Sequence, residues 1–143
     1  MGAREEKIVL DFIGAYRDSW PDDLAKALEP LSEDAYYQIV VPTIAPVRGR
    51  ANIQAEHKLM QDTGCEDQKH TMISYGSSDK VVFTERIDHS KRNGTWSDVP
   101  LVAVFEVNEA GEITAWREYL DLVNISKSHG MTVDELVTSL KLD

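Results

Sequence analysis

The chain has 143 residues, 42% of them hydrophobic, and its 15 Lys and Arg against 25 Asp and Glu give a formal net charge of −10 at pH 7. This length fits a single domain over residues 1–143, with a core large enough to enclose a pocket. The negative charge argues against binding to nucleic acid or to an anionic membrane surface, which leaves small neutral or cationic molecules as the expected ligands.

The amino-terminal segment and the cysteine content predict a cytoplasmic protein. Residues 1–6 lack the apolar core of a signal peptide, and no apolar run approaches the ~18 residues of a membrane-spanning helix. Cys65 is the single cysteine of the sequence and cannot form a disulfide within the chain, which fits a reducing compartment.

Helical periodicity dominates the first part of the chain. Apolar residues share one face of residues 5–19, which predicts an amphipathic helix, and a second apolar stripe after Pro21 predicts a short helix over residues 24–31. Residues 35–41 are rich in aromatic and β-branched side chains and predict a strand. The prolines that follow it indicate that this strand is short and lies at a sheet edge.

A third amphipathic helix is predicted between residues 49 and 64, where Ile53, His57 and Met60 share a face. The period then changes to two, and turn-forming residues divide four predicted antiparallel strands, at residues 69–75, 80–89, 100–107 and 113–122. Thr132 begins a capping box, which predicts a closing helix over residues 133–140.

This order of helices and strands predicts the fold class. Helices followed by a meander of strands are typical of an α+β domain. We expect a cone-shaped α+β barrel, in which a curved, mixed or antiparallel sheet wraps around the N-terminal helices. A ligand would then lie between the concave face of the sheet and the helices.

Two of the predicted strands carry charged residues on one face. Period two places Arg86 beside Asp88, and it groups Glu118 with Trp116 and Leu120. If the two faces coincide, Arg86 can hold both carboxylates in an otherwise apolar cavity. Because two carboxylates would then share one cation, one of them would have a raised pKa and keep its proton, giving an acid and a base. The alternative is that both strands show these charges to solvent as cross-strand pairs.

Four segments are similar to a known family: residues 6–12 (Glu-Lys-Ile-Val-Leu-Asp-Phe), 84–88 (Thr-Glu-Arg-Ile-Asp), 104–107 (Val-Phe-Glu-Val) and 113–122 (Ile-Thr-Ala-Trp-Arg-Glu-Tyr-Leu-Asp-Leu). On these motifs the chain resembles the limonene-1,2-epoxide hydrolases. These are cofactor-free enzymes on the nuclear-transport-factor-like or SnoaL-like α+β cone. Ketosteroid isomerases and small polyketide cyclases share that cone.

The resemblance implies a reaction and roles for four residues. Water would open a hydrophobic, terpenoid-like epoxide in one step, with no cofactor and no covalent intermediate. Asp88 corresponds to the family's general acid and Arg86 to its bridging arginine. Glu118 corresponds to the water-activating base, which is normally aspartate, and Tyr37 to a tyrosine that helps to hold the attacking water.

Two departures from the family pattern concern the attacking water. The family uses Tyr-x-Asn to hold it, whereas this chain has Tyr37, Gln38 and Ile39, so the amide is lost. Glu118 is also one methylene longer than aspartate, which extends it by roughly 1.5 Å. These changes indicate either a different substrate or a different reaction on the same cone, as an isomerase, cyclase or dehydratase would catalyse.

The predicted cavity wall is mostly apolar or aromatic and suits a small hydrophobic molecule. Its candidate residues are Ile13, Tyr16, Ile39, His57, Met60, Trp116, Leu120 and Ile125. Each also fits an ordinary core position. His57 could move a proton in the cavity or be a core histidine bonded to a backbone carbonyl. No spacing of histidines or cysteines suggests a metal site.

The opposite face of the sheet is also apolar, with Val81, Phe83, Ile87 and Tyr119. Because an apolar sheet face needs a cover, we expect a homodimer formed through this face, which the resemblance implies as well. A third interpretation is a non-catalytic binding or dimerisation module.

Overall fold

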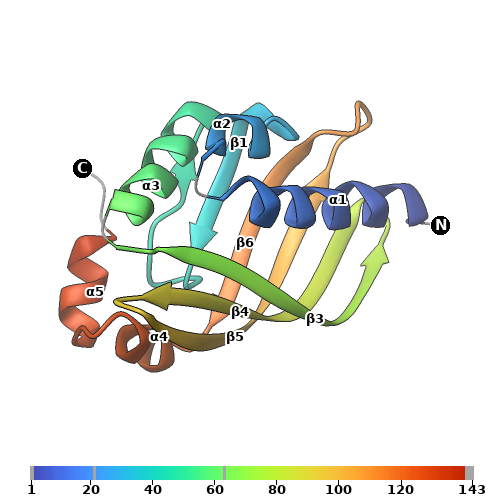
Figure 1. The fold of residues 1–143 in the computed structure, drawn as a ribbon. Helices are drawn as coiled ribbons and strands as arrows, with labels where there is room; N and C mark the ends of the chain where they lie inside the picture. Colours follow the sequence, from blue (N-terminus) through green and yellow to red (C-terminus); the bar gives the residue numbers. More distant parts are fainter. Residues whose placement is uncertain (1, 21, 63, 141–143) are drawn as a thin grey trace.

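A strongly curved six-stranded sheet dominates the computed structural model, which describes residues 2–20, 22–62 and 64–140 (Figure 1). Its strands lie in the order β2-β1-β6-β5-β4-β3. The bounds are β1 (Leu31–Ile39), β2 (Val47–Arg48), β3 (Asp67–Ser78), β4 (Val81–Arg92), β5 (Thr95–Val107) and β6 (Ile113–Leu120). All neighbours are antiparallel except β1 and β6, which are parallel.

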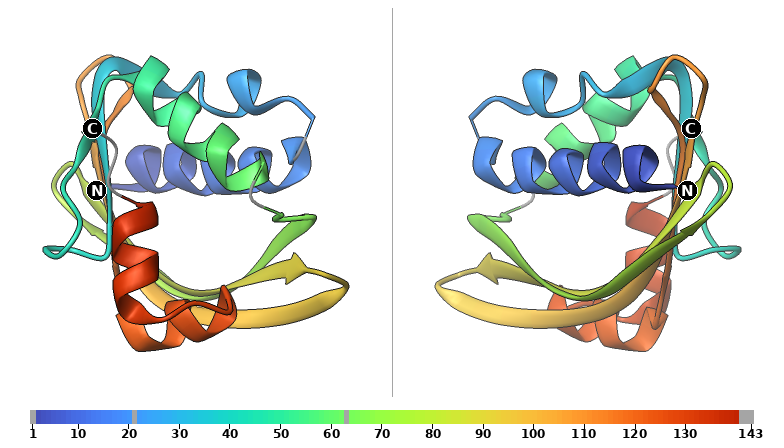
Figure 2. Two further views of the ribbon diagram at one scale, coloured as in Figure 1. Left: turned by 90° about the vertical axis from the view of Figure 1, so that its left-hand side faces the viewer. Right: turned by 90° about the vertical axis from the view of Figure 1, so that its right-hand side faces the viewer.

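The described residues also form five helices. The bounds are α1 (Ala3–Ser19), α2 (Leu24–Ala27), α3 (Arg50–Asp62), α4 (Leu122–Ser128) and α5 (Val133–Ser139). The sheet curves around α1 and α3, while α4 and α5 lie at the end away from the amino terminus (Figures 1 and 2). The predicted α+β cone is therefore confirmed. Within the ranges described, no helix has both the length and the hydropathy to cross a membrane.

The first strand corrects two predictions. It begins at Leu31 rather than at residue 35, and the preceding helix α2 is a single turn that ends at Ala27. Leu31 pairs with Ile113 of β6, so a partner more than eighty residues away overrides the local helical periodicity. The strand is also not at the edge of the sheet, because the two-residue strand β2, which the sequence did not predict, pairs with it on the other side.

The remaining strands are longer or shorter than predicted because of the turns that limit them. Two-residue turns at Asp79 and Lys80 and at Asn93 and Gly94 let β3, β4 and β5 pair up to their ends. Asp79, Asn93 and Gly94 have positive φ, as such hairpins require. The last strand instead stops at Leu120.

Helix α4 was not predicted. Asp121 caps it, since its side chain accepts a hydrogen bond of 3.0 Å from the Asn124 N–H. The closing helix α5 and its capping threonine are as predicted, with Thr132 Oγ1 accepting from the Glu135 N–H over 3.1 Å.

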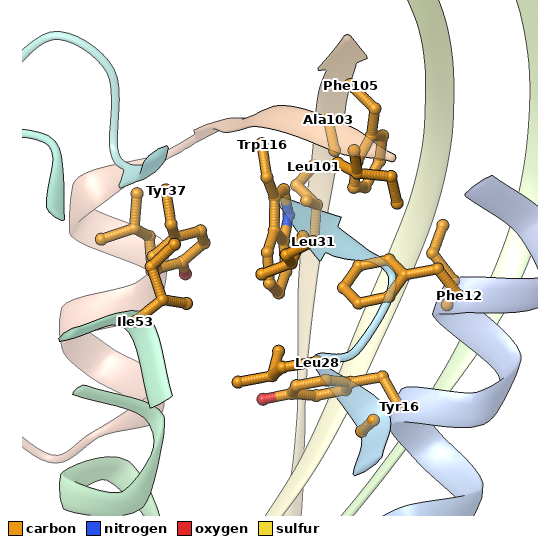
Figure 3. Packing of buried hydrophobic residues seen from close by; sticks show 14 of the residues in the cluster. Phe12, Tyr16, Leu28, Leu31, Tyr37, Ile53, Leu101, Ala103, Phe105 and Trp116 are labelled. Carbon is orange, nitrogen blue, oxygen red and sulfur yellow. The ribbon is translucent and has the colours of Figure 1, made fainter. Parts of the chain in front are cut away.

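Aromatic side chains fill the space between α1, α3 and the concave face. Figure 3 shows Trp116 between Phe12 on one side and Tyr37 with Ile53 on the other. The Trp116 ring lies 5.2 Å from Phe12, edge to face, and 4.5 Å from Tyr37, measured between ring centroids. Such packing fixes the orientation of the side chains next to it.

Candidate active site

The central strands bring the two charged faces together across β5. Thr84, Ala103 and Glu118 are register partners, as are Arg86, Leu101 and Leu120. All of them face the concave side, so the prediction that the two faces coincide is confirmed. Ala103, which has a small side chain, lies between Thr84 and Glu118 in this register, and the Arg86 guanidinium reaches across the middle strand to Glu118.

Arg86 bridges the two carboxylates. Its Nε donates to Asp88 Oδ1 over 2.8 Å and its Nη2 to Glu118 Oε2 over 2.7 Å, while Nη1 donates to Thr84 Oγ1 over 3.0 Å. The Arg86 side chain is only 2% exposed. Burial acts to lower the pKa of Arg86, but the two carboxylates outweigh it and raise the pKa, so the guanidinium stays charged.

A second cation at Asp88 was not predicted. Arg17 of α1 places its Nη2 2.8 Å from Asp88 Oδ1 and donates through Nη1 to Gln68. The sequence therefore predicted one cation for two carboxylates, whereas the structure has two. Arg17 follows the apolar Ile13 by four residues, so it lies beside the buried stripe of its helix, and this spacing could have revealed it.

The two carboxyl groups differ in their surroundings. Burial acts to raise the pKa of Asp88, but Arg17 and Arg86 together outweigh it and the pKa is lowered. Burial raises the pKa of Glu118, and the nearby Arg86 reduces that rise without cancelling it. The pKa values of the two groups are therefore shifted in opposite directions, as two carboxyl groups in unlike surroundings should be.

Two tyrosines and a histidine stand next to the bridge. Tyr37 Oη donates to Glu118 Oε1 over 2.9 Å, and burial raises the pKa of Tyr37 well above its usual value, so it keeps its proton. Tyr16 Oη lies 2.6 Å from His57 Nδ1. Burial lowers the pKa of His57 to about 3, so its ring is neutral, and its partner is a tyrosine rather than a backbone carbonyl.

These groups border a cavity of about 500 Å³. Among its lining residues are Arg86, Asp88, Glu118 and Tyr37, together with seven of the eight candidates for substrate contact: Tyr16, Ile39, His57, Met60, Trp116, Leu120 and Ile125. The eighth, Ile13, is buried in the core and does not line the cavity. The described residues contain no cluster of His, Cys, Asp and Glu that could hold a metal ion.

A third acidic residue in the cavity wall was also missed. Glu56 of α3 is 5% exposed, and burial raises its pKa to about 7. Its Oε2 has no hydrogen-bond partner among the described residues. Glu56 follows Ile53 by three residues and precedes Met60 by four, so helical spacing places it within the apolar stripe and could have identified it.

Comparison with known proteins adds sequence and structural relatives. The family model of the limonene-1,2-epoxide hydrolase catalytic domain matches residues 4–130. An LEH-like epoxide hydrolase of M. tuberculosis has a TM-score of 0.72 and 24% identity, over 95% of this chain and 96% of that one. SalBIII, an epoxide hydrolase/cyclase-like enzyme in pyran ring formation in polyether salinomycin, has a TM-score of 0.72 and 18% identity, over 85% and 93%.

A third structure is similar over most of its length. A protein of ketosteroid isomerase-like fold from Catenulispora acidiphila has a TM-score of 0.69 and 20% identity, over 87% of this chain and 95% of that one. At these identities the structural likeness establishes the fold, on which several chemistries occur.

Proposed function

The chain belongs to the limonene-1,2-epoxide hydrolase family, and on that premise we propose that it opens an epoxide by adding water to give a diol. The observation that carries the proposal is the bridge of Asp88, Arg86 and Glu118 inside the cavity. Hydrolysis needs one carboxyl group that gives a proton to the ring oxygen and one carboxylate that takes a proton from water. The two groups of the bridge supply both when they hold one proton between them.

The size and the lining of the cavity favour a compact hydrophobic epoxide of terpenoid-like size as the substrate. Its volume of about 500 Å³ lies within the range of small-molecule sites. Apolar side chains such as Val99, Leu101 and Leu136 form much of its wall around the charged bridge. An apolar wall binds the hydrocarbon part of the substrate and keeps bulk water from the reacting atoms.

A cyclase is the second candidate, and Ile39 favours it. Ile39 is the register partner of Glu118 and lines the cavity at the position where the family pattern has a water-holding amide. Without that amide, a hydroxyl group of the substrate itself could attack the epoxide. The product would then be a cyclic ether instead of a diol.

The first experiment measures products from a panel of cyclic, aryl and hydroxyl-bearing epoxides. We expect the wild type to form diols, and Glu118→Gln and Asp88→Asn to lose at least 100-fold in rate. Glu85→Gln is the matched control, because Glu85 lies on β4 but is exposed on the other face. Cyclic ether from the hydroxyl-bearing epoxides without diol would favour the cyclase, and no opening of any epoxide would reject both.

We also infer that a second copy of the chain covers the convex face of the sheet. Of the four residues that predicted such an interface, Phe83 and Tyr119 are 41% and 43% exposed, and Val102 beside them is 39% exposed. Large apolar side chains clustered in this way favour an interface. Sedimentation of the purified protein would test the homodimer, and a monomer at micromolar concentration would contradict it.

A further inference from the structure

Glu56 of α3 is an acidic residue of the cavity wall that the proposed reaction does not use. It is 5% exposed, and its Oε2 has no hydrogen-bond partner within the described ranges. We propose that the Glu56 carboxylate binds an ammonium group of the substrate, which is then a small epoxide with an amino group on an otherwise apolar skeleton. That an epoxide carries the amino group rests on the proposed function, whereas the recognition of an ammonium group rests on the contacts within the cavity.

The cations nearest to Glu56 in the chain are engaged elsewhere. Lys58 Nζ lies 2.8 Å from Asp62 Oδ1 on the same helix, and Arg50 Nη1 donates to a backbone carbonyl group at the start of β1 over 3.1 Å. The adjacent His57 carries no charge, because burial lowers its pKa to about 3. Glu56 therefore receives no positive charge from its own helix.

The other acidic residues of the cavity wall are matched by cations. Arg86 donates to Asp88 over 2.8 Å and to Glu118 over 2.7 Å, and Arg17 Nη2 lies 2.8 Å from Asp88 Oδ1. Two guanidinium groups thus balance these two carboxyl groups. A third acidic side chain in the same cavity has no such balance, and a cationic ligand would supply it.

Two further cations line the cavity, Arg92 at the end of β4 and Lys127 in α4. Arg92 Nη2 donates to His129 Nε2 over 3.1 Å. Within the part of the chain that the structure describes, neither cation forms an ion pair with Glu56. The missing charge at Glu56 therefore remains when these cations of the cavity wall are considered as well.

An ammonium group satisfies a buried carboxylate more fully than a neutral donor does. Burial raises the pKa of Glu56 to about 7, and no neighbouring cation offsets this rise. An ammonium group would offset it, because it brings a positive charge together with N–H donors, whereas a hydroxyl group brings one donor and no charge. The net charge of −10 also attracts cations from solution toward the protein.

Tyr37 links the surroundings of Glu56 to those of the charged bridge. Its Oη donates to Glu118 Oε1 over 2.9 Å, and the charge of Glu56 contributes to the raised pKa of Tyr37, so both carboxyl groups lie near this hydroxyl group. The apolar side chains of Ile39 and Met60 line the same cavity. A single small molecule can therefore present an epoxide ring to the bridge and an ammonium group to Glu56, with hydrocarbon between them.

Two unreactive probes test the preference for a positive charge. Cyclohexylmethylamine and cyclohexylmethanol have nearly the same shape, and the amine is charged at neutral pH while the alcohol is not. We expect calorimetry to show that the wild type binds the amine at least about 10-fold more tightly than the alcohol. Equal affinities, or tighter binding of the alcohol, would overturn the proposal.

Variants show which carboxyl group carries the preference. Glu56→Gln should bind the two probes with equal affinity, and Glu56→Asp, which keeps the charge, should retain part of the preference. Asp62→Asn is the matched control, since Asp62 is an exposed acidic residue of the same helix, and it should keep the whole preference. A preference that survives in Glu56→Gln and disappears in Glu118→Gln would assign the ammonium group to the bridge and overturn the proposal.

Turnover separates this inference from the proposed function. With cyclohexene oxides that carry or lack an aminomethyl group, Glu56→Gln should raise KM for the amine-bearing epoxide by about 10-fold, with a smaller change in kcat. A preference for the amine probe in a protein that opens no epoxide would reject only the proposed function. Diol formation without any preference for the amine would overturn only the inference about Glu56.

Discussion

The concave and convex faces of the sheet reverse the usual distribution of charge. On the inner face, Arg86 and Glu118 are buried and paired, whereas on the outer face of the same strands Phe83 and Tyr119 are more than 40% exposed. A sheet with one free face normally buries its apolar side and exposes its charges. Neither face is what stability alone would favour, which is why we propose a reaction at the buried charges and an interface at the exposed apolar side chains.

The largest expected effect comes from breaking the inner ion pairs. Arg86→Met removes the cation that Asp88 and Glu118 share, so we expect a loss of about 3–5 kcal/mol in the free energy of unfolding at pH 7, together with loss of epoxide opening. Denaturant unfolding measures the loss of stability, and product assays measure the loss of epoxide opening. The matched control is Arg117→Met, which breaks the pair of Arg117 with Glu106 on the outer face. The outer pair should contribute only about 1 kcal/mol to the free energy of unfolding. If Arg86→Met and Arg117→Met lost equal stability, the inner ion pairs would not differ from the outer one.

A smaller effect is expected from placing a charge on the outer face. Tyr119→Glu should weaken self-association by about 2–3 kcal/mol, which is roughly a 30- to 150-fold rise in the dimer dissociation constant. Sedimentation velocity over a range of concentrations measures it. Thr114→Glu lies on the same strand and is the control. A Tyr119→Glu protein that associates like the wild type would show that Tyr119 does not belong to an interface.

The smallest expected effect concerns Glu56, an inner carboxyl group for which no ion pair is found among the described residues. Its pKa of about 7 in the folded protein exceeds the ordinary value of 4.5, so the folded state binds more protons between these pH values. The free energy of unfolding therefore falls as pH rises from about 4.5 to 7. Glu56→Gln should remove this dependence and gain about 1–2 kcal/mol relative to the wild type at pH 8, but not at pH 4. Unfolding curves at both pH values measure it, with Glu85→Gln of the outer face as the control, and a gain independent of pH would contradict the assignment.

Local patterns predicted the strands that carry the chemistry, since period two depends only on neighbouring residues. That rule placed Arg86, Asp88 and Glu118 on faces that the register then brings together. The start of β1 at Leu31 could not be predicted in this way, because it depends on a parallel pairing with Ile113. Helix α4 was missed although Asp121 is a good capping residue, because it follows the last strand without a break.

The candidate site was predictable only in part for a similar reason. The bridge lies within strands whose pattern is local, whereas Arg17 reaches Asp88 from a helix some seventy residues away in the chain. The sequence therefore predicted the two carboxyl groups and the arginine that bridges them, but not the second cation beside Asp88. Helical spacing offered a signal for Arg17 and Glu56, since both lie on or beside apolar stripes.

Ala103 has a consequence for how this site can change over time. Ala103 carries a single methyl group and is the register partner of Glu118 on the middle strand, which the Arg86 guanidinium spans to reach that carboxylate. We expect a larger side chain at this position to push the Arg86 guanidinium away from Glu118 without altering either residue. The ion pair would then depend on the small volume of a residue that carries no reactive group, so we expect a bulkier residue at position 103 to disrupt the site while every reactive group remains in place.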